Sequence, residues 1–215
     1  MGQNYEKLRW IRKIITTIAV AKYIINMSDS HPLAKFAYCP RCGSADFTAN
    51  GPRSKRCGHC GFVYYLNASA ATAAFIINRR SEILVSRRAF EPAKGTLDLP
   101  GGFVDPGEAT DQGMRREILE ETGCHVAEMR WLFSLPNSYS FSGFEVPTAD
   151  SFFLCRLAEG EKPAACDDAA ALEWVAINAL RPADFGLDSI RKAVGIFASR
   201  PYMQVLPLPL RRGFE

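Results

Sequence analysis

The chain has 215 residues, of which 47% are apolar and 11% aromatic, so it can bury a hydrophobic core and does not have the composition of a disordered polypeptide. Its formal net charge is only +3, and residues 1–26 carry +4, so everything after them sums to about −1. This balance excludes the protein-wide basic field that a general nucleic-acid binder uses.

The first 26 residues admit three interpretations. A basic start followed by the apolar run 14–21 resembles a signal peptide, although Lys22 interrupts the run, which is too short to span a bilayer. Alternatively, apolar residues recur at helical spacing and favour an amphipathic helix on a membrane or on the domain: Leu8, Ile11, Ile15 and Ile18. The third interpretation is that Met27 is the natural start. We treat residues 1–35 as an N-terminal extension.

Four of the seven cysteines form two C-x-x-C pairs that are separated by 14 residues, each pair followed by glycine: Cys39, Cys42, Cys57 and Cys60. Two such knuckles can place four thiolates tetrahedrally around one Zn²⁺, and the glycines permit the tight turns beneath the metal. The spacing therefore predicts a zinc ribbon over 36–66. Because four thiolates leave no open coordination position, this zinc is expected to be structural. The alternatives are unligated thiols or two disulfides.

The other polar groups near the ribbon have simpler interpretations. His59 lies inside the second knuckle and is expected to be a solvated side chain. The basic residues Arg53, Lys55 and Arg56 indicate a solvated hairpin, with a phosphate contact as the alternative. Three cysteines lack partners at metal spacing and are expected to be reduced and buried: Cys124, Cys155 and Cys166. The cysteines do not resemble a secreted disulfide framework, which favours a cytoplasmic protein.

From residue 67 the pattern changes to alternating and continuous apolar runs typical of strands. The predicted strands cover 68–78, 81–88, 129–136, 151–157 and 171–177. A helix capped by Thr110 or Asp111 is predicted to run to about Thr122 and to be ended by Gly123, and a second helix is predicted over 187–200. The fold class is therefore α+β, a mixed sheet with helices against it, in a domain over 67–205 with a tail at 206–215.

The first of these helices concentrates negative charge. Glu117, Glu120 and Glu121 stand at i, i+3 and i+4, so their carboxylates crowd one face within about one turn and repel each other. Hard cations such as Mg²⁺ or Mn²⁺ would explain this arrangement, because they prefer oxygen ligands. A solvated acidic helix is the alternative, but it does not explain the paired Gly101 and Gly102, which let the backbone approach a metal closely.

The residues that flank these glutamates complete a recognisable motif. Pro106 and Gly107 shape a return that brings Glu108 toward Arg116. Gly102, five residues, Glu108, seven residues and then the run 116–124, R-E-I-L-E-E-T-G-C, match every fixed position of the Nudix box, G-x5-E-x7-R-E-U-x-E-E-x-G-U with U apolar. The chain resembles the Nudix hydrolases over roughly 67–205, and the ribbon before this region resembles the layout of the NADH pyrophosphatase branch.

The resemblance implies a Nudix α/β/α sandwich whose loop–helix–loop holds divalent metals and cleaves a nucleoside diphosphate linked to another group. It implies that Glu120 and Glu121 are metal ligands, with the carbonyl of Gly102 as a further ligand. Glu117 would be a ligand or the base that activates water, while Arg116 and Glu108 would hold the glutamates in place. An additional metal-binding carboxylate outside the box is common in the family, and four residues are candidates: Glu145, Asp150, Asp168 and Glu173.

The substrate is less well specified. The NADH branch carries a signature beginning Ser-Gln-Pro-Trp after its box, whereas this chain keeps Ser134 and Pro136 but has Leu135 and Asn137 at the other two positions. Specificity for NADH is therefore in doubt. Three aromatic residues in this segment are candidates for stacking a base, with packing as the alternative: Tyr139, Phe141 and Phe144.

We therefore expect a metal-dependent pyrophosphatase acting on NADH, ADP-ribose or a nucleotide sugar. The alternatives are a nucleoside triphosphate pyrophosphohydrolase that cleans the nucleotide pool, a nucleotide-sensing regulator with a DNA-binding ribbon, and a hydrolase whose ribbon docks a partner-held or RNA-cap substrate. The expected partner is a nucleotide-derived small molecule; the sequence argues against membrane and nucleic-acid partners and is compatible with a homodimer.

Overall fold

The computed structural model describes residues 31–166 and 169–199, and these residues divide into two compact units after Asn67. The three interpretations of residues 1–26, and the predicted tail at 206–215, lie outside the described residues.

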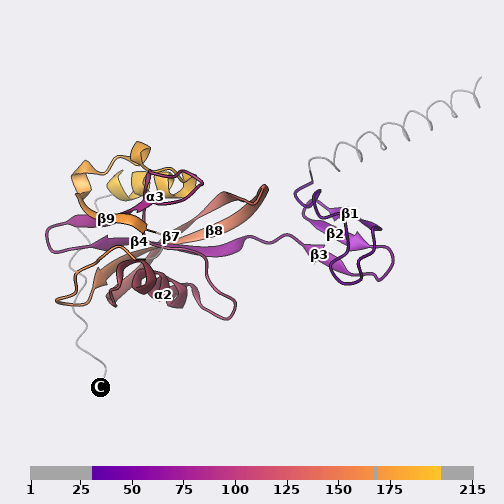
Figure 1. Cartoon of the computed structure of the whole chain (residues 1–215), viewed down its shortest axis with the longest axis horizontal. Coiled ribbons are helices and arrows are strands. Elements are labelled where there is room, and N and C mark those ends of the chain that lie inside the picture. The colour runs from indigo at the N-terminus through magenta and orange to yellow at the C-terminus, as the bar shows by residue number, and fades with distance from the viewer. Residues whose placement is uncertain (1–30, 167–168, 200–215) are drawn as a thin grey trace, which may run out of the picture. The chain divides into compact units, whose positions relative to one another are not determined.

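The described part of the first unit is a small antiparallel sheet (Figure 1). Its strands are β1 (Phe47–Gly51), β2 (Ser54–Cys57) and β3 (Val63–Tyr65), in the order β1-β2-β3. Phe47 packs with the buried Cys39 and Cys57 in its core. Lys55 is not the solvated residue that the sequence predicts: its ammonium donates to the carbonyl of Phe36 at 2.7 Å and lies over the ring of Phe47, so the side chain is buried.

The second unit is built on one mixed sheet of six strands, as predicted. The strands are β4 (Ser69–Ile77), β5 (Glu82–Arg88), β6 (Leu97–Asp98), β7 (Val126–Phe141), β8 (Phe144–Leu157) and β9 (Ala169–Ala176). Their order is β6-β5-β4-β8-β7, with β9 paired to β5. The β4–β8 pair is parallel and the other pairs are antiparallel.

Strands β7 and β8 are much longer than the predicted strands at 129–136 and 151–157. The segment 137–141, which lies outside the predicted strands, continues the ladder to Phe141, which pairs with Phe144. The two residues between them, Ser142 and Gly143, have φ of 51° and 71°. Both values are positive, as in the two-residue turns that match the twist of a hairpin. Because the β7–β8 ladder continues up to this two-residue turn, the segment forms a hairpin.

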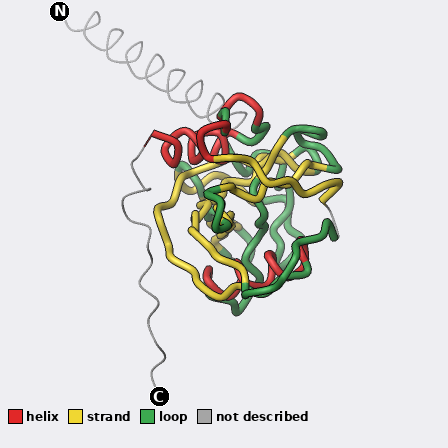
Figure 2. The backbone as a smooth tube through the Cα atoms, turned by 90° about the vertical axis from the view of Figure 1, so that its left-hand side faces the viewer, coloured by secondary structure: helices red, strands yellow, loops and turns green. Residues whose placement is uncertain are grey.

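Two helices cover opposite faces of the sheet, which gives the predicted α/β/α sandwich (Figures 1 and 2). Helix α2 (Thr110–Thr122) inserts Met114 and Ile118 against Ile76, Leu84 and Phe153. Helix α3 (Asp188–Ser199) buries its apolar stripe against the other face, where these residues form the larger core: Phe75, Ile83, Val85, Phe152, Leu154, Val194 and Phe197. Short 3-10 turns at Ile177–Ala179 and Pro182–Asp184 lead into α3.

The ends of α2 differ in how well the sequence predicts them. Gly123 ends the helix in the left-handed conformation, with φ of 68°, and its N–H donates to the carbonyl of Leu119, as expected. The N-cap is Ala109, and the prediction of Thr110 or Asp111 is wrong. Ala109 has no side-chain acceptor, and the side chain of Gln112 instead accepts from the Ala109 N–H at 2.8 Å.

The remaining cysteines are free thiols. Cys124 and Cys155 are buried, as predicted, but the prediction of a buried side chain is wrong for Cys166, which is exposed. Among the described residues, no helix has the length and apolar character needed to cross a membrane.

Candidate active site and candidate zinc centre

The ribbon brings its four predicted cysteines together. Their Sγ atoms all lie within 4.8 Å of one another, and both the Cys39–Cys60 and the Cys42–Cys57 Sγ pairs are 3.7 Å apart. A tetrahedral site with Zn–S bonds of about 2.3 Å has S···S edges of about 3.8 Å. The four sulfurs are therefore spaced as ligands of one tetrahedral metal ion, and they are also reduced.

The backbone of the knuckles prepares this cluster. Gly43 and Gly61 adopt φ of 73° and 72°, and each donates its N–H to the carbonyl of the first cysteine of its pair. The N–H of Cys60 also donates to Sγ of Cys57. This backbone donor, with that of His59, lowers the pKa of Cys57 to about 6 and favours the thiolate that a metal binds.

In the second unit, the loop before α2 is held along strand β4. Thr72 N–H donates to the Gly102 carbonyl at 2.8 Å, and Ala74 N–H donates to that of Pro100 at 2.9 Å. A Cβ atom at Gly102 would lie 2.6 Å from Oε1 of Glu117, and one at Gly101 would overlap the carbonyl oxygen of Thr72. Both positions therefore need glycine because of close approach, with the carboxylate of Glu117 directly beside the loop.

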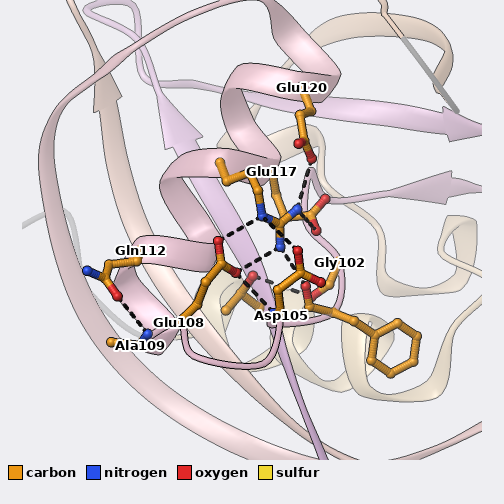
Figure 3. Close-up of polar contacts among 10 residues, drawn as sticks. Gly102, Asp105, Glu108, Ala109, Gln112, Glu117 and Glu120 are labelled. Atoms are coloured by element: carbon orange, nitrogen blue, oxygen red, sulfur yellow. Dashed lines mark hydrogen bonds and ion pairs between the residues drawn. The ribbon is translucent and has the colours of Figure 1, made fainter.

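Arg116 is the centre of the acidic cluster, and Figure 3 shows three of its partners, Glu108, Glu117 and Glu120. Its guanidinium binds both carboxylate oxygens of Glu108, at 2.9 and 3.0 Å. It also donates to Glu117 at 2.8 Å, to Glu120 at 2.9 Å and to the carbonyl of Phe103 at 2.9 Å. One side chain thus connects the loop to two of the three crowded glutamates, and Glu108 meets Arg116 as the Pro106–Gly107 return predicts.

These contacts shift the pKa values in opposite directions. Hydrogen bonds from Arg116, and from the Asp105 N–H, hold the pKa of Glu108 below its usual value. Burial raises the pKa of Glu117 despite its bond to Arg116, and the nearby Glu120 adds to this. The same carboxylates, Glu108 above all, raise the pKa of Arg116, so this side chain remains charged.

The box residues fit a divalent cation in their chemistry. The donor set is carboxylate oxygen, which Mg²⁺ and Mn²⁺ prefer, and the missing Cβ of Gly102 lets the Glu117 carboxylate lie directly against the loop. Glu121 also reaches this loop, where its Oε1 accepts from the N–H of Gly101 at 3.4 Å. Within the described ranges, however, the four cysteines are the only group of three or more potential metal ligands whose ligand atoms all lie within 4.8 Å of one another, so Glu117, Glu120 and Glu121 are not gathered as tightly.

A cavity of about 440 Å³ opens beside the box. Glu117 and Glu121 line it together with Gly101 and Gly102. Its other walls come from the end of β5 and the loop after it, from the β7–β8 hairpin and from the start of α3, with these residues among them: Arg88, Phe90, Asp98, Phe103, Asn137, Tyr139, Thr148, Asp150, Leu187 and Ile190.

Of the three aromatic residues predicted to bind the substrate, one lines the cavity and two do not. Tyr139 lines it and meets the ring of Phe103 edge to face, with the centroids 5.9 Å apart. Phe141 and Phe144 pair at the tip of the hairpin instead, where Phe141 is 65% exposed, and neither lines the cavity.

The four candidate metal-binding carboxylates outside the box also differ in whether they line the cavity. Asp150 lines the cavity. Glu145 accepts from Ser138 on the hairpin, and Glu173 pairs with Arg87 at 3.0 Å; neither lines the cavity. Asp168 lies outside the described residues.

Sequence reasoning missed a buried ion pair in the cavity wall. Arg88 donates to Asp98 at 2.6 Å, with the side chains 16% and 12% exposed. Burial raises the pKa of Asp98 above its usual value. The sequence spacing of Arg88 and Asp98 does not predict this contact. It depends on the antiparallel pairing of β5 with β6, which a loop containing Gly95 connects. Phe103 was missed too, although its place directly after Gly102 was a usable signal.

Comparison with known proteins agrees with this geometry. The NUDIX domain matches residues 67–194, which is more than half of the chain. The chain belongs to the NUDIX domain family. The resemblance found in the sequence is therefore confirmed at the level of the family, and the matched residues cover the sheet, the box, helix α2 and the first half of α3.

The curated relatives and solved structures of this family are distant. A protein named NAD-capped RNA hydrolase NudC from Haemophilus influenzae is 29% identical over 109 residues, covering 50% of this chain and 41% of the relative. The NudC of Vibrio parahaemolyticus is 24% identical, covering 71% and 55%. The chain thus spans about half the length of these relatives. A NUDIX hydrolase structure from Nitrosomonas europaea has a TM-score of 0.58 at 22% identity, covering 78% of this chain and 90% of that one, which supports the fold.

Proposed function

We propose that this protein hydrolyses the diphosphate bond of a nucleoside diphosphate linked to another group, using Mg²⁺ or Mn²⁺. The observation that carries the proposal is the position of the box: Glu117 and Glu121 line the same cavity as the Gly101–Gly102 backbone, while Arg116 binds Glu117 and Glu120. Carboxylates that line a cavity of this size suit a cation that bridges them to a substrate phosphate.

Each box residue has a role in this proposal. Glu120, Glu121 and the Gly102 carbonyl hold the cation, and Glu117 is either a further ligand or the base that accepts a proton from the attacking water. When bound, the cation neutralises charge on the diphosphate and lowers the pKa of a water molecule. Arg116 fixes the carboxylates and is itself fixed by its two bonds to Glu108. The Gly102 carbonyl accepts from the Thr72 N–H at 2.8 Å and from the Thr72 hydroxyl group at 3.4 Å, so a cation bound there would replace the longer hydroxyl contact.

Diphosphate-linked nucleotides are the favoured substrates because the relatives are named for hydrolysis of NAD-capped RNA, whose cap contains such a bond. In the ribbon, we propose that a structural Zn²⁺ occupies the four cysteines, since their S···S spacing matches a tetrahedral ion. A homodimer is an open prediction.

A turnover panel tests the function. Purified protein is incubated with NADH, ADP-ribose, a nucleotide sugar, an NAD-capped short RNA and nucleoside triphosphates, each with Mg²⁺, with Mn²⁺ and with chelator. We expect metal-dependent release of two monophosphate-containing products from the diphosphate-linked compounds, and weaker action on triphosphates. If kcat/KM is highest for a triphosphate that yields inorganic pyrophosphate, the protein is a pool-cleaning enzyme instead. No hydrolysis of any compound would favour a nucleotide-sensing regulator.

A further inference from the structure

One carboxylate in the cavity wall belongs neither to the box nor to the Arg88–Asp98 ion pair. Asp150 on β8 is 6% exposed, yet it lines the cavity. Both of its oxygens are fixed: Thr148 Oγ1 donates to Oδ1 at 2.6 Å, and Ser189 Oγ on α3 donates to Oδ2 at 2.5 Å. The two hydroxyl groups are themselves buried, so the carboxylate cannot turn away from the cavity without losing short hydrogen bonds.

Asp150 keeps acceptor capacity in this arrangement. An ionised carboxylate offers about four lone-pair positions, and the two hydroxyl groups use two of them. A cavity wall with a rigid, buried acceptor pair suits a ligand that offers two adjacent hydrogen-bond donors. A phosphate is disfavoured there, because two anions would meet in a poorly solvated place.

The sheet register places this acceptor near the box. Asp150 pairs with Ala71 on β4, and Ala71 pairs in turn with Phe103, the residue after Gly102. The backbones of Asp150 and Phe103 therefore lie two strand spacings apart, which is roughly 10 Å. Of the parts of a nucleotide, the pentose is attached directly to the diphosphate, and its two hydroxyl groups are adjacent donors. The base lies farther away along the molecule.

We infer that Asp150 is a specificity-determining residue that accepts hydrogen bonds from the vicinal 2′- and 3′-hydroxyl groups of the substrate's pentose, so that the site selects ribonucleotides over deoxyribonucleotides. This inference rests on the proposed function and adds to it the sugar that the site reads. A site built to bond a substrate hydroxyl group rejects the analogue that lacks it, because its own polar group is then left unsatisfied.

The test compares symmetric substrates that differ only in these hydroxyl groups. Wild-type protein is assayed with diadenosine diphosphate and with its bis(2′-deoxy) and bis(3′-deoxy) forms, in which both pentoses are changed. We expect kcat/KM to fall on the order of 10- to 100-fold when a hydroxyl group is lost, the range for a hydrogen bond to a charged group. In Asp150→Asn the preference for the ribose form should shrink by a similar factor, mainly through a higher KM for the ribose form.

Two further variants separate recognition from structure. Asp188→Asn removes an exposed carboxylate that binds Lys192 at the start of the same helix, and it should leave the ribose preference unchanged. Thr148→Val keeps the shape of the wall but removes one of the donors that fix Asp150, so it should reduce the preference partly. Because it leaves Asp150 and Ser189 in place, it serves if Asp150→Asn does not fold, and thermal melting shows which variants are folded.

Several results would overturn the inference while leaving the proposed function intact. One is equal hydrolysis of the ribose and deoxyribose forms by wild-type protein. Another is a uniform loss on both forms in Asp150→Asn, which a purely structural contact to α3 would give. A third is an effect of Asp150→Asn that follows the base in a diinosine diphosphate control, because the carboxylate would then read the base edge. Failure to hydrolyse diadenosine diphosphate while ADP-ribose is hydrolysed would also count against it, whereas no hydrolysis of any diphosphate would reject the function itself.

Discussion

The thiols of the ribbon and the glutamates of the box are held together by different means. In the ribbon, backbone turns at Gly43 and Gly61 place four sulfurs at tetrahedral spacing within residues 39–61. In the box, a helix supplies three carboxylates at fixed spacing, and the guanidinium group of Arg116 donates hydrogen bonds to two of them. The first arrangement could enclose a metal ion on all sides, which suits a structural role, while the second leaves one side open to a cavity, which suits chemistry.

The largest expected effect is on the ribbon side of this comparison. Cys39→Ser removes one of the four thiolates, and because metal binding supplies folding free energy in such sites, we expect loss of bound zinc and unfolding of the ribbon. Elemental analysis and a thiol titration measure this. Cys166→Ser is the matched control, since that thiol is exposed and outside the cluster, and it should retain one zinc per chain. Purified wild-type protein with four free ribbon thiols and no zinc would contradict the assignment.

On the box side, Glu121→Gln or Glu120→Gln should lower kcat by a factor on the order of 10² or more, because each removes a charged metal ligand. The fold should be unchanged, as measured by thermal melting, because neither side chain belongs to the hydrophobic core under α2. Asp111→Asn is the matched control: it removes an exposed carboxylate from the first turn of the same helix. Wild-type turnover by a folded Glu120→Gln variant would show that the metal assignment is wrong.

The contrast between the two sites also explains what the sequence could and could not predict. Both are short-range patterns: the spacings C-x-x-C and i, i+3, i+4 fix local geometry, so the neighbours of Cys57 and of Glu117 follow from the sequence alone. The cavity wall depends instead on the register of strands far apart in the chain. Nothing local links Asp150 to Ser189, 39 residues away, or Arg88 to Asp98 across a turn.

The hairpin shows a second limit. Tyr139 and Phe141 are two residues apart and share a strand face, so the sequence pattern makes them equal candidates for stacking. The cavity ends between them, and only Tyr139 reaches Phe103. Strand alternation predicts the side of the sheet, but where a cavity ends depends on the elements packed above it.

A smaller effect is expected at Gly102, in the loop before α2. Gly102→Ala puts a Cβ atom 2.6 Å from Oε1 of Glu117, so the carboxylate or the loop must move by about 1 Å. We expect a 10- to 100-fold loss of kcat, the typical cost of disturbing groups that orient metal ligands, with little change in melting temperature. Gly160→Ala is the control for simple glycine removal, since a Cβ there meets no atom within 4 Å, although its positive φ costs some stability. Unchanged kcat in Gly102→Ala would mean that the close approach is irrelevant to the site.

The smallest expected effect is acid sensitivity of the Arg116 cluster. Arg116 lowers the pKa of Glu108 in the folded protein, so Glu108 contributes stability that is fully present above the ordinary glutamate pKa of about 4.3. This contribution is lost as the pH falls through the lowered pKa, because the carboxylate must then be protonated and releases Arg116. The Glu108→Gln variant has no such carboxylate and cannot lose this contribution. The melting temperature of the wild type should therefore fall more steeply than that of Glu108→Gln as the pH is lowered from about 6 into the acid range.

Burial gives the pKa of Glu117 the opposite shift, so the protonation of Glu117 in the same range partly offsets the loss of stability. The comparison with Glu108→Gln isolates the contribution of Glu108. Parallel melting curves for both proteins over this range would mean that the contacts between Glu108 and Arg116 do not stabilise the fold.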